Sequence, residues 1–304
     1  MMVTSGVSKP VLALFPGQGS QIVGMSRKVA ENSPHASEVF DAASNVLGID
    51  ARALCWRTPI ETLTLTENAQ PAITIASLAS WAATRGDLAD APTTAAGHSV
   101  GAIAAAVAAG CLSLSSAFEL AAARGQLMAD VPGRGSMLAV AVGAVDSVDE
   151  QEQRAQSLAN RFALDVGAVN GPTQIVLSGE HDAVVAASEE LGGKAKQLAV
   201  SHAFHSRMMV PAEERWQALI ERIEIGDPEA GSYHGCITGA RAQSAVSVRQ
   251  DLASSLTMPV LWSRVMTATK DLPEVRVFGP GKAIARLAKP YSKRRTIVEQ
   301  ETGR

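Results

Sequence analysis

The sequence predicts an α/β protein made of a large body and a small inserted subdomain. A Gly-x-Ser-x-Gly pentapeptide at 97–101 lies between a short strand-like stretch, 93–96, and an alanine-rich helical run, 102–109. Residues 133–201 show a different order: strand, helix, strand, strand, helix, strand. Both patterns mix strands with helices, and the second is short enough to fold as an insertion into the first.

The chain opens with a strand and a glycine-rich loop. Val11–Phe15 is a short apolar run of the kind that forms a buried strand, and Pro-Gly-Gln-Gly-Ser at 16–20 ends it. Helical periodicity runs toward Asn32 and again over 68–82, where Pro71 stands near the first turn. The body therefore begins with one buried strand and two helices.

The pentapeptide has the form of a nucleophile elbow, in which a serine occupies a tight strand-to-helix turn. Gly97 and Gly101 permit a turn tight enough to strain Ser99 and to push its hydroxyl clear of the backbone. The helix that follows directs its free amide groups to the place where an oxyanion would form on an attacked carbonyl. The sequence therefore predicts an α/β-hydrolase-like body with Ser99 as a nucleophile.

The inserted subdomain begins after a helix at 113–128. Its order β-α-β-β-α-β is the ferredoxin-like motif. The predicted domains are a large α/β domain, 1–132 with 202–304, and a ferredoxin-like small subdomain, 133–201. The strands expected in the subdomain are 137–142, 163–169, 174–178 and 196–200, and the helices are 147–159 and 181–191. Beyond it we expect a helix at 208–223, strands at 236–238 and 275–278, and a loop at 279–282.

Composition narrows the classes of function. The 304 residues carry a net charge of −3 and only 4% aromatic side chains, so no basic, stacking surface for nucleic acid is expected. Residues 1–10 lack the apolar core of a signal peptide, and no apolar stretch approaches the ~18 residues that cross a bilayer. Cys55, Cys111 and Cys236 are odd in number and widely spaced, which argues against disulfides and a thiolate metal site. We expect a cytoplasmic protein without a metal or a membrane partner.

A nucleophilic serine needs a base, and two of the six histidines are well placed for that role. His98 adjoins Ser99 and would point away from its hydroxyl. His202 and His205 stand where the chain re-enters the body, after the serine in chain order, as the base does in α/β-hydrolase-like proteins. From the residues alone, either of these two is a candidate base.

Eight segments in order resemble the malonyl-CoA:acyl-carrier-protein transacylases and the acyltransferase domains of polyketide synthases. The resemblance spans nearly the whole chain. The matching segments are Phe-Pro-Gly-Gln-Gly-Ser-Gln at 15–21, Glu-Asn-Ala-Gln-Pro-Ala at 67–72, the elbow at 97–101, Arg-Gly at 124–125, Gly-Ser-Met at 135–137, Val-Asn-Gly-Pro at 169–172, Phe-His-Ser at 204–206 with Met208 and Pro211, and Phe-Gly-Pro-Gly at 278–281.

The resemblance implies a serine acyltransferase. Ser99 would carry the acyl group, and His205 would be its general base. In this family a backbone carbonyl of the Pro-Val-x-Trp stretch orients the base, which here implies Leu261. The backbone N–H groups of Gln18 and Val100 would stabilise the oxyanion.

The resemblance also implies a pocket for a malonyl group, with malonyl-CoA as substrate and no bound cofactor. Arg124 would hold the free carboxylate of malonyl in a bidentate pair. His202-Ala203-Phe204-His205 resembles the tetrapeptide of malonyl-selective enzymes, and Phe204 would fill the space that an α-methyl group needs. The residues expected to bind the substrate are Arg124, Gln70, Asn170, His202 and Phe204.

The implied partner is a phosphopantetheinylated acyl carrier protein of fatty-acid or polyketide synthesis, and a monomer is favoured. Ala102 stands where fatty-acid relatives usually carry glutamate, and alanine also occurs in the transacylase subunit of malonate decarboxylase, so the pathway stays open. A serine esterase or thioesterase is the rival enzyme, although no obvious acidic partner for the histidine is seen. A non-catalytic module that binds carrier proteins is the other alternative.

Carrier proteins of this kind are usually acidic, so docking is expected to use a local basic cluster. Lys194, Lys196 and Arg207 flank the histidine segment and are the favoured cluster. The second candidate cluster lies near the C-terminus and contains Lys282, Arg286, Lys289, Lys293, Arg294 and Arg295.

Overall fold

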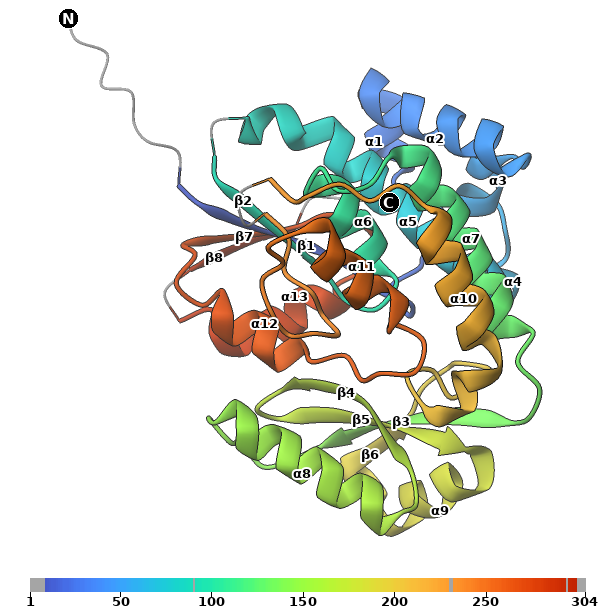
Figure 1. Ribbon diagram of the computed structural model, residues 1–304, viewed down its shortest axis with the longest axis vertical. Coiled ribbons are helices and arrows are strands. Elements are labelled where there is room, and N and C mark those ends of the chain that lie inside the picture. Colours follow the sequence, from blue (N-terminus) through green and yellow to red (C-terminus); the bar gives the residue numbers. More distant parts are fainter. Residues whose placement is uncertain (1–8, 90, 230–231, 294, 300–304) are drawn as a thin grey trace, which may run out of the picture.

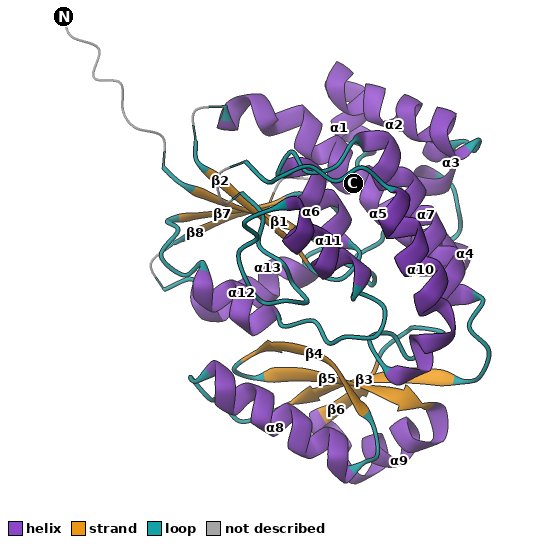
Figure 2. Ribbon diagram, in the orientation of Figure 1, coloured by secondary structure: helices purple, strands orange, loops and turns teal. Residues whose placement is uncertain are grey.

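The chain forms two separate β-sheets within residues 9–89, 91–229, 232–293 and 295–299, which are the residues that the computed structural model describes (Figure 1). Figure 2 shows the larger sheet among most of the helices, and the smaller sheet as a separate layer at one end of the molecule. The mixed α/β class is confirmed. The prediction that residues 1–10 form no signal peptide falls largely on residues 1–8, which lie outside the described residues. None of the described helices is long and apolar enough to span a membrane.

The large sheet is parallel, with the strand order β2-β1-β7-β8. β1 is buried along its whole length because it pairs on both sides, and a continuous apolar run suits such a strand. The strands predicted at 11–15, 93–96 and 275–278 are confirmed, whereas β8 was not expected. The four strands are β1 (Val11–Phe15), β2 (Thr93–Gly97), β7 (Glu274–Val277) and β8 (Thr296–Glu299).

Helices surround this sheet, and capping residues in the sequence explain where several of these helices begin and end. Ser33 caps α2 by accepting a hydrogen bond from the Ala36 N–H, and Gly48 ends the helix at φ 66°. α5 packs against α2, α6 and α7, so it is buried on nearly every side. The helices of the body are α1 (Arg27–Asn32), α2 (Pro34–Leu47), α3 (Ala51–Trp56), α4 (Ile60–Leu63), α5 (Thr66–Thr84), α6 (Gly101–Ala108), α7 (Leu114–Ala129), α10 (Val210–Arg222), α11 (Ala245–Ala253), α12 (Trp262–Ala268) and α13 (Ala283–Ala288). Short 3-10 turns lie at Arg85–Leu88, Gly192–Lys194, Arg207–Met209 and Lys289–Tyr291.

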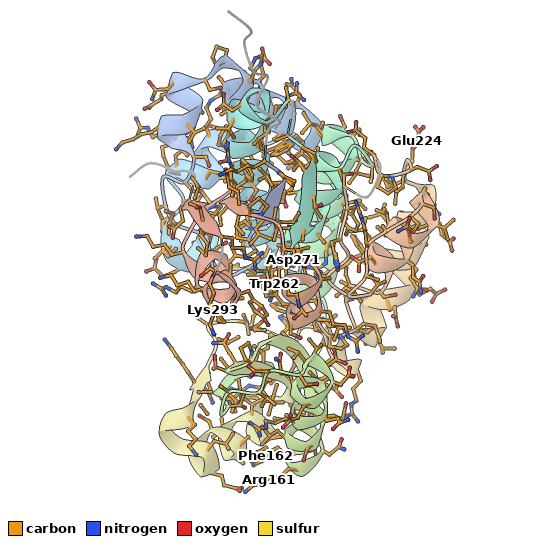
Figure 3. The ribbon with its side chains drawn as sticks, turned by 90° about the vertical axis from the view of Figure 1, so that its left-hand side faces the viewer. Arg161, Phe162, Glu224, Trp262, Asp271 and Lys293 are labelled. Atoms are coloured by element: carbon orange, nitrogen blue, oxygen red, sulfur yellow. The ribbon has the colours of Figure 1, made fainter. Side chains whose placement is uncertain are left out.

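The small sheet is antiparallel, with the order β4-β5-β3-β6. Figure 1 shows α8 and α9 on the face that is turned away from the body. In Figure 3 Arg161, the last residue of α8, and Phe162, which follows it, lie at the tip of this layer, whereas Trp262 lies inside the body. Each predicted element is present, with ends shifted by a few residues. The elements are β3 (Gly135–Ala141), α8 (Val148–Arg161), β4 (Asp165–Gly171), β5 (Gln174–Glu180), α9 (His181–Leu191) and β6 (Ala195–Gln197).

Residues 236–238 form no strand, and that prediction is wrong. The segment is a bent loop whose backbone N–H groups converge on the carboxylate of Asp251 in α11. The N–H groups of Ile237 and Thr238 each donate to this carboxylate at 2.8 Å, and the Tyr233 hydroxyl donates at 2.9 Å. Asp251 is only 1% exposed, so a buried side chain satisfies polar groups that a neighbouring strand would otherwise pair.

Two of the contacts that join the small layer to the body are made by α12 and the loop before it. Val260 continues the small sheet as an isolated parallel bridge to Ala168 of β4, and the Val169 N–H donates to the Val260 carbonyl at 2.8 Å. Arg264 of α12 makes two hydrogen bonds to Glu152 of α8, at 2.5 and 2.8 Å. The loop before α12 is therefore tied to both layers, next to the functional residues described below.

Candidate active site

Ser99 occupies a tight turn between β2 and α6, with a backbone φ of 54°. A Cβ on Gly97 would lie 2.0 Å from the carbonyl group of Gly101, and a Cβ on Gly101 would lie 2.3 Å from the Phe15 oxygen. The strand-to-helix turn is confirmed. The glycines are required because backbones approach closely there, while the left-handed strain falls on the serine itself.

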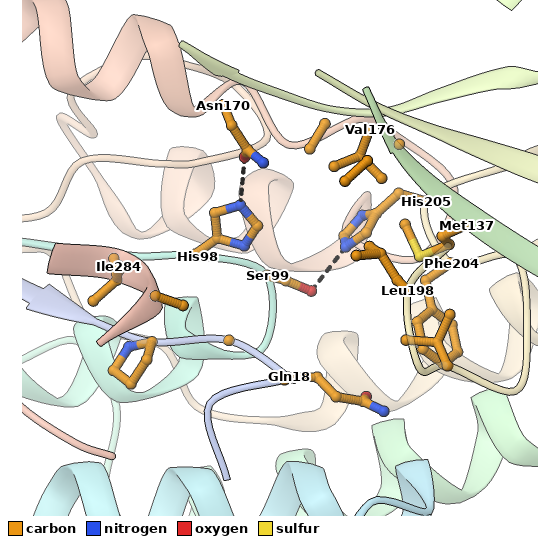
Figure 4. A pocket seen from close by; sticks show the side chains of 18 of the residues that line it. Gln18, His98, Ser99, Met137, Asn170, Val176, Leu198, Phe204, His205 and Ile284 are labelled. Carbon is orange, nitrogen blue, oxygen red and sulfur yellow. Dashed lines mark hydrogen bonds between the residues drawn. The ribbon is translucent and has the colours of Figure 1, made fainter. Parts of the chain in front are cut away.

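The Ser99 hydroxyl lies 2.7 Å from Nε2 of His205, and Figure 4 shows the two side chains facing each other. The other ring nitrogen, Nδ1, lies 3.0 Å from the carbonyl oxygen of Met258. A proton on Nδ1 donated to that carbonyl leaves the lone pair of Nε2 directed at the hydroxyl. The expectation that Leu261 orients the base is wrong, because the carbonyl that reaches the ring comes three residues earlier.

The environment of His205 keeps its ring neutral. The side chain is buried, at 4% exposure, and the positive charge of Arg124 lies nearby. Burial first, and repulsion from Arg124 second, lower the pKa of His205 from 6.5 to about 3, against the opposing effect of the Met258 hydrogen bond. A neutral imidazole is the form that accepts a proton.

Arg124 of α7 is a buried cation whose guanidinium is held from two sides. Its Nη1 donates to the Gln70 amide oxygen at 2.8 Å, and one Nη2 proton goes to the Ser255 carbonyl at 2.8 Å. Nη2 also lies 3.4 Å from the Ser99 hydroxyl. Burial lowers the pKa of Arg124 to about 10, so the side chain remains charged at neutral pH. No carboxylate pairs with it among the described residues, which leaves the charge available to a ligand.

The loop at 16–20 approaches the same turn. A Cβ on Gly17 would lie 2.5 Å from the His98 carbonyl oxygen, so only glycine allows this approach. Within the described part of the chain, neither the Gln18 N–H nor the Val100 N–H donates to a protein acceptor. These two backbone groups can therefore donate to a bound molecule.

His98 does not contact the serine hydroxyl, in agreement with the sequence analysis. Its Nε2 lies 2.9 Å from the amide oxygen of Asn170, and the Asn170 amide nitrogen donates to Gln174. The ring also packs on Trp262, with centroids 5.4 Å apart. His98 therefore connects the elbow of the body to strand β4 and the residues around it in the small layer.

The serine opens into a cavity of about 360 Å³ between the two layers (Figure 4). Side chains alternate along a strand, so Met137 and Val176 face this cavity while Leu138 and Leu177 face α8 and α9. Ile284 of α13 lines another part of the wall. The small sheet is thus apolar on both faces, one for its own core and one for the cavity.

The structure separates the expected substrate-binding residues into two groups. His202 is absent from the cavity wall, because its Nε2 contacts the Val131 carbonyl at 3.1 Å and its ring stacks on Phe204. The expectation that His202 binds the substrate is therefore wrong. The other four expected residues, Gln70, Arg124, Asn170 and Phe204, line the cavity, and so does Gln18, which was expected to contribute only its backbone N–H.

Met258 and Ser255 are functional contacts that sequence reasoning missed. Each reaches the site through a backbone carbonyl, Met258 toward His205 and Ser255 toward Arg124, and the Ser255 hydroxyl also accepts from Arg124 Nε at 3.3 Å. A backbone carbonyl has no residue-type signature, and the only signal was their position just before the Pro-Val-x-Trp stretch. Among the described residues, no three His, Cys, Asp or Glu side chains gather as the ligands of a metal ion would.

Comparison with known proteins matches residues 13–278 to the acyl transferase domain. The malonyl CoA-acyl carrier protein transacylase of Bacillus subtilis is 33% identical over 283 residues, which cover 91% of this chain and 70% of that protein. The transacylase structure from Coxiella burnetii is 29% identical with a TM-score of 0.88, covering 98% of this chain and 96% of the other. A malonyl transacylase solved in complex with a type II polyketide synthase acyl carrier protein is 30% identical with a TM-score of 0.85, covering 95% of each chain. The chain spans only 5 to 22% of the length of other relatives that it matches, among them the phenolphthiocerol synthesis polyketide synthase of Mycobacterium marinum.

Proposed function

The chain belongs to the acyl transferase domain family, and from that premise we propose that it transfers malonyl from malonyl-CoA to the phosphopantetheine thiol of an acyl carrier protein. A malonyl ester of Ser99 is the intermediate. One observation carries the proposal: the serine hydroxyl lies 2.7 Å from His205 and 3.4 Å from the Arg124 guanidinium. A nucleophile, its base and a buried cation thus meet in one cavity.

The first half-reaction loads the serine. His205 Nε2 accepts the hydroxyl proton while Ser99 Oγ bonds to the thioester carbonyl carbon, and the carbonyl electron pair moves onto its oxygen. The backbone N–H groups of Gln18 and Val100 donate to this oxyanion. When the C–S bond breaks, the sulfur of coenzyme A leaves with the electron pair and takes the proton from His205.

The second half-reaction repeats these steps in reverse with the carrier thiol. The thiol gives its proton to His205 and attacks the malonyl ester, and Ser99 recovers a proton as it leaves. The steps make and break only the ester bond of Ser99, the C–S bonds of the two thioesters and the bonds to the proton that His205 carries, so no bound cofactor is needed in this scheme. Arg124 supports transfer over hydrolysis, because a cation that holds the malonyl carboxylate keeps the acyl group placed for the incoming thiol.

We assign Arg124 to the free carboxylate of malonyl and Phe204 to the limit on acyl size. The guanidinium already has Gln70 and Ser255 as neutral partners, so a carboxylate is the missing charge. Phe204 lines the cavity and is only 5% exposed, so its ring restricts the room for an α-substituent. Gln70 and Asn170 act in this scheme by holding Arg124 and His98 in place.

The finer description of the fold is also a proposal. The strand order β4-β5-β3-β6 with α8 and α9 on one face supports a ferredoxin-like subdomain at 133–201. The elbow at the end of a parallel strand supports an α/β-hydrolase-like body made of 1–132 and 202–304.

The test is covalent labelling with radioactive malonyl-CoA, followed by addition of a panel of phosphopantetheinylated carrier proteins. We expect a stable malonyl-protein that loses its label to the carrier, and no label on Ser99→Ala. Label retained by Ser99→Ala at the level of the unmodified chain would refute the assignment of the nucleophile. The carrier that accepts malonyl fastest identifies the pathway, including the malonate decarboxylase alternative.

His205 and His202 provide a matched pair for the base. His205→Ala should slow self-acylation about 10²-fold or more, because only a base within hydrogen-bond reach accepts the proton. His202→Ala should lose far less, since the ring of His202 is directed at Val131. Equal losses would overturn the assignment of the base. Hydrolysis of the malonyl ester faster than its transfer to any carrier would indicate a thioesterase instead.

A further inference from the structure

We propose that Thr66, the first residue of α5, is a positioning residue for the malonyl carboxylate, acting through the side-chain amides of Gln18 and Gln70. The inference rests on the proposed function. Thr66 is 1% exposed, and its hydroxyl lies between these two amides. It connects the loop after β1 to α5, and through Gln70 to Arg124 of α7.

Four polar side chains form one connected series of hydrogen bonds. The Thr66 hydroxyl donates to Gln18 Oε1 at 2.7 Å and accepts from Gln70 Nε2 at 3.3 Å. Gln70 stands one helical turn after Thr66, so their side chains share a face of α5. The amide oxygen of Gln70 then accepts from Arg124 Nη1 at 2.8 Å.

The single proton of the hydroxyl fixes the orientation of both amides. Because Thr66 donates to Gln18, it has only lone pairs to offer Gln70, so Gln70 must present its NH₂ to the hydroxyl and its oxygen to Arg124. A flipped Gln70 would bring its NH₂ group against the guanidinium of Arg124, where two donors repel. Thr66 thereby selects the one orientation of Gln70 that supports the cation.

The hydrogen bond from Thr66 also decides which atom of the Gln18 amide is left for a ligand. Its oxygen is occupied by Thr66, while its Nε2 is buried and has no hydrogen-bond partner among the described residues. Gln18 lines the cavity (Figure 4). Arg124 lines the same cavity. A carboxylate accepts about four hydrogen bonds, so the malonyl carboxylate takes this N–H in addition to the guanidinium. The side chain of Gln18 thus gains a role in substrate binding that is distinct from its backbone N–H.

The test compares acylation by malonyl-CoA and by acetyl-CoA in three variants. Thr66→Val keeps the shape of the side chain and removes the hydroxyl. Its kcat/KM for malonyl-CoA should fall about tenfold or more, because two buried amides lose a hydrogen-bond partner. Its kcat/KM for acetyl-CoA should change by less than about threefold. Thr66→Ser restores the hydroxyl and should return malonyl use to near the unmodified rate. Thr74→Val is the matched control, because Thr74 lies on α5, is also 1% exposed, and has an Oγ1 without a partner in the described structure.

A second measurement separates this inference from the proposed function. In NMR spectra, the slowly exchanging side-chain NH₂ protons of Gln70 should persist in Thr66→Ser and be lost in Thr66→Val, whatever the chain acylates. Three results in Thr66→Val would each overturn the role of Thr66. They are equal losses of kcat/KM for malonyl-CoA and acetyl-CoA, an unchanged kcat/KM for malonyl-CoA, and Gln70 NH₂ protons that still exchange slowly. Failure of the unmodified chain to form a malonyl ester would refute the proposed function, and the NMR result would still decide whether Thr66 orients Gln70.

Discussion

At the scale of single residues, His205 is a base without an acidic partner among the residues that the structure describes. Its Nδ1 faces the Met258 carbonyl, a neutral acceptor that orients the ring without adding negative charge. Repulsion from Arg124 lowers the pKa of the ring further below its usual range. A carboxylate paired with Arg124 would cancel this repulsion, so binding of malonyl is expected to make His205 more basic. The buried cation then favours malonyl both by attraction and by activating the base.

The lowered pKa of His205 predicts a distinctive pH dependence. With a folded-state pKa of about 3 and an unfolded value near 6.5, the ring binds a proton between these pH values only in the unfolded chain. The free energy of unfolding should therefore fall as pH drops below about 6.5. The value of kcat/KM for self-acylation reports the free enzyme, in which the ring stays neutral, so it should show no inflection near pH 6.5. Thermal unfolding and acylation rates between pH 5 and 8 measure both. His205→Gln should lose stability less steeply over this range, and an inflection at pH 6.5 in kcat/KM would contradict the prediction.

Loss of the charge at Arg124 should change the choice of substrate. Arg124→Gln should weaken malonyl use by about 3 kcal/mol, the scale of an unpaired buried charge, because the malonyl carboxylate would lose its cation. Acetyl-CoA has no such carboxylate, so its use should suffer less or improve. The ratio of the two kcat/KM values gives the measurement, with Arg57→Gln, an exposed side chain, as the control. A uniform loss for both substrates would mean that Arg124 only supports the fold.

At the scale of elements, the sequence predicted those with a strong pattern and missed those that depend on distant contacts. β1 and the helix at 113–128 have apolar runs or long helical periods, and both are present. β8 is four residues long at a sheet edge, and α3 and α4, with six and four residues, are too short to show a period. The wrongly predicted strand at 236–238 is explained by Asp251, a side chain about 13 residues away that binds its backbone.

At the elbow, the spacing of the glycines predicts the shape of the turn but not the contacts that require glycine there. The glycines at 97 and 101 predicted a tight turn, and the turn is present. Spacing could not show that the β1 backbone, 86 residues earlier, is what excludes a side chain at Gly101. Likewise, neither Met258 nor Ser255 could be identified, because the chain path of the loop after α11 brings their carbonyls to the site.

Close backbone contact at the elbow predicts that Gly101→Ala is strongly destabilising. Its Cβ would lie 2.3 Å from the Phe15 oxygen and 2.7 Å from the Pro16 oxygen, so β1 and α6 must separate. We expect a loss of more than about 4 kcal/mol in the free energy of unfolding, the scale of severe core overpacking. Gly86→Ala is the control, since nothing lies within 4 Å of its added Cβ. Chemical denaturation of both variants decides; a loss below about 1 kcal/mol in Gly101→Ala would contradict the steric argument.

At the scale of the whole molecule, the site depends on both layers at once. The body supplies the serine, the base and the cation, while the small sheet supplies Met137 and Val176 of the cavity wall. The expected division of the chain predicted that these layers would meet near the histidine segment. It could not predict that the loop at 255–261 holds Arg124, His205 and strand β4 together, because those contacts join segments that are far apart in sequence.

The basic residues proposed for docking differ in their surroundings. Arg207 is committed to Asp165, to which its Nη2 donates at 2.6 Å and its Nε at 3.0 Å, so its charge is largely neutralised. Arg295 is buried at 9% exposure, and Arg294 lies outside the described residues. Exposed positions near the cavity remain on both layers. These are Lys194 and Lys196, close to the cavity-lining Leu198, and Lys282 and Arg286 at α13, of which Arg286 itself lines the cavity.

An acidic carrier protein should therefore use basic side chains from both layers. Reversing Lys194 and Lys196 to glutamate, or separately Lys282 and Arg286, should raise the KM for the carrier about fivefold or more at low salt, because exposed charges steer the encounter. Self-acylation by malonyl-CoA should stay nearly intact in Lys194→Glu with Lys196→Glu. Lys28→Glu on α1, at the end of the molecule away from the small sheet (Figure 1), is the control. If only the variant with Lys282 and Arg286 reversed raises the KM for the carrier, docking is confined to the body. If neither variant does, the carrier reaches the cavity without these charges, and an apolar contact must replace them.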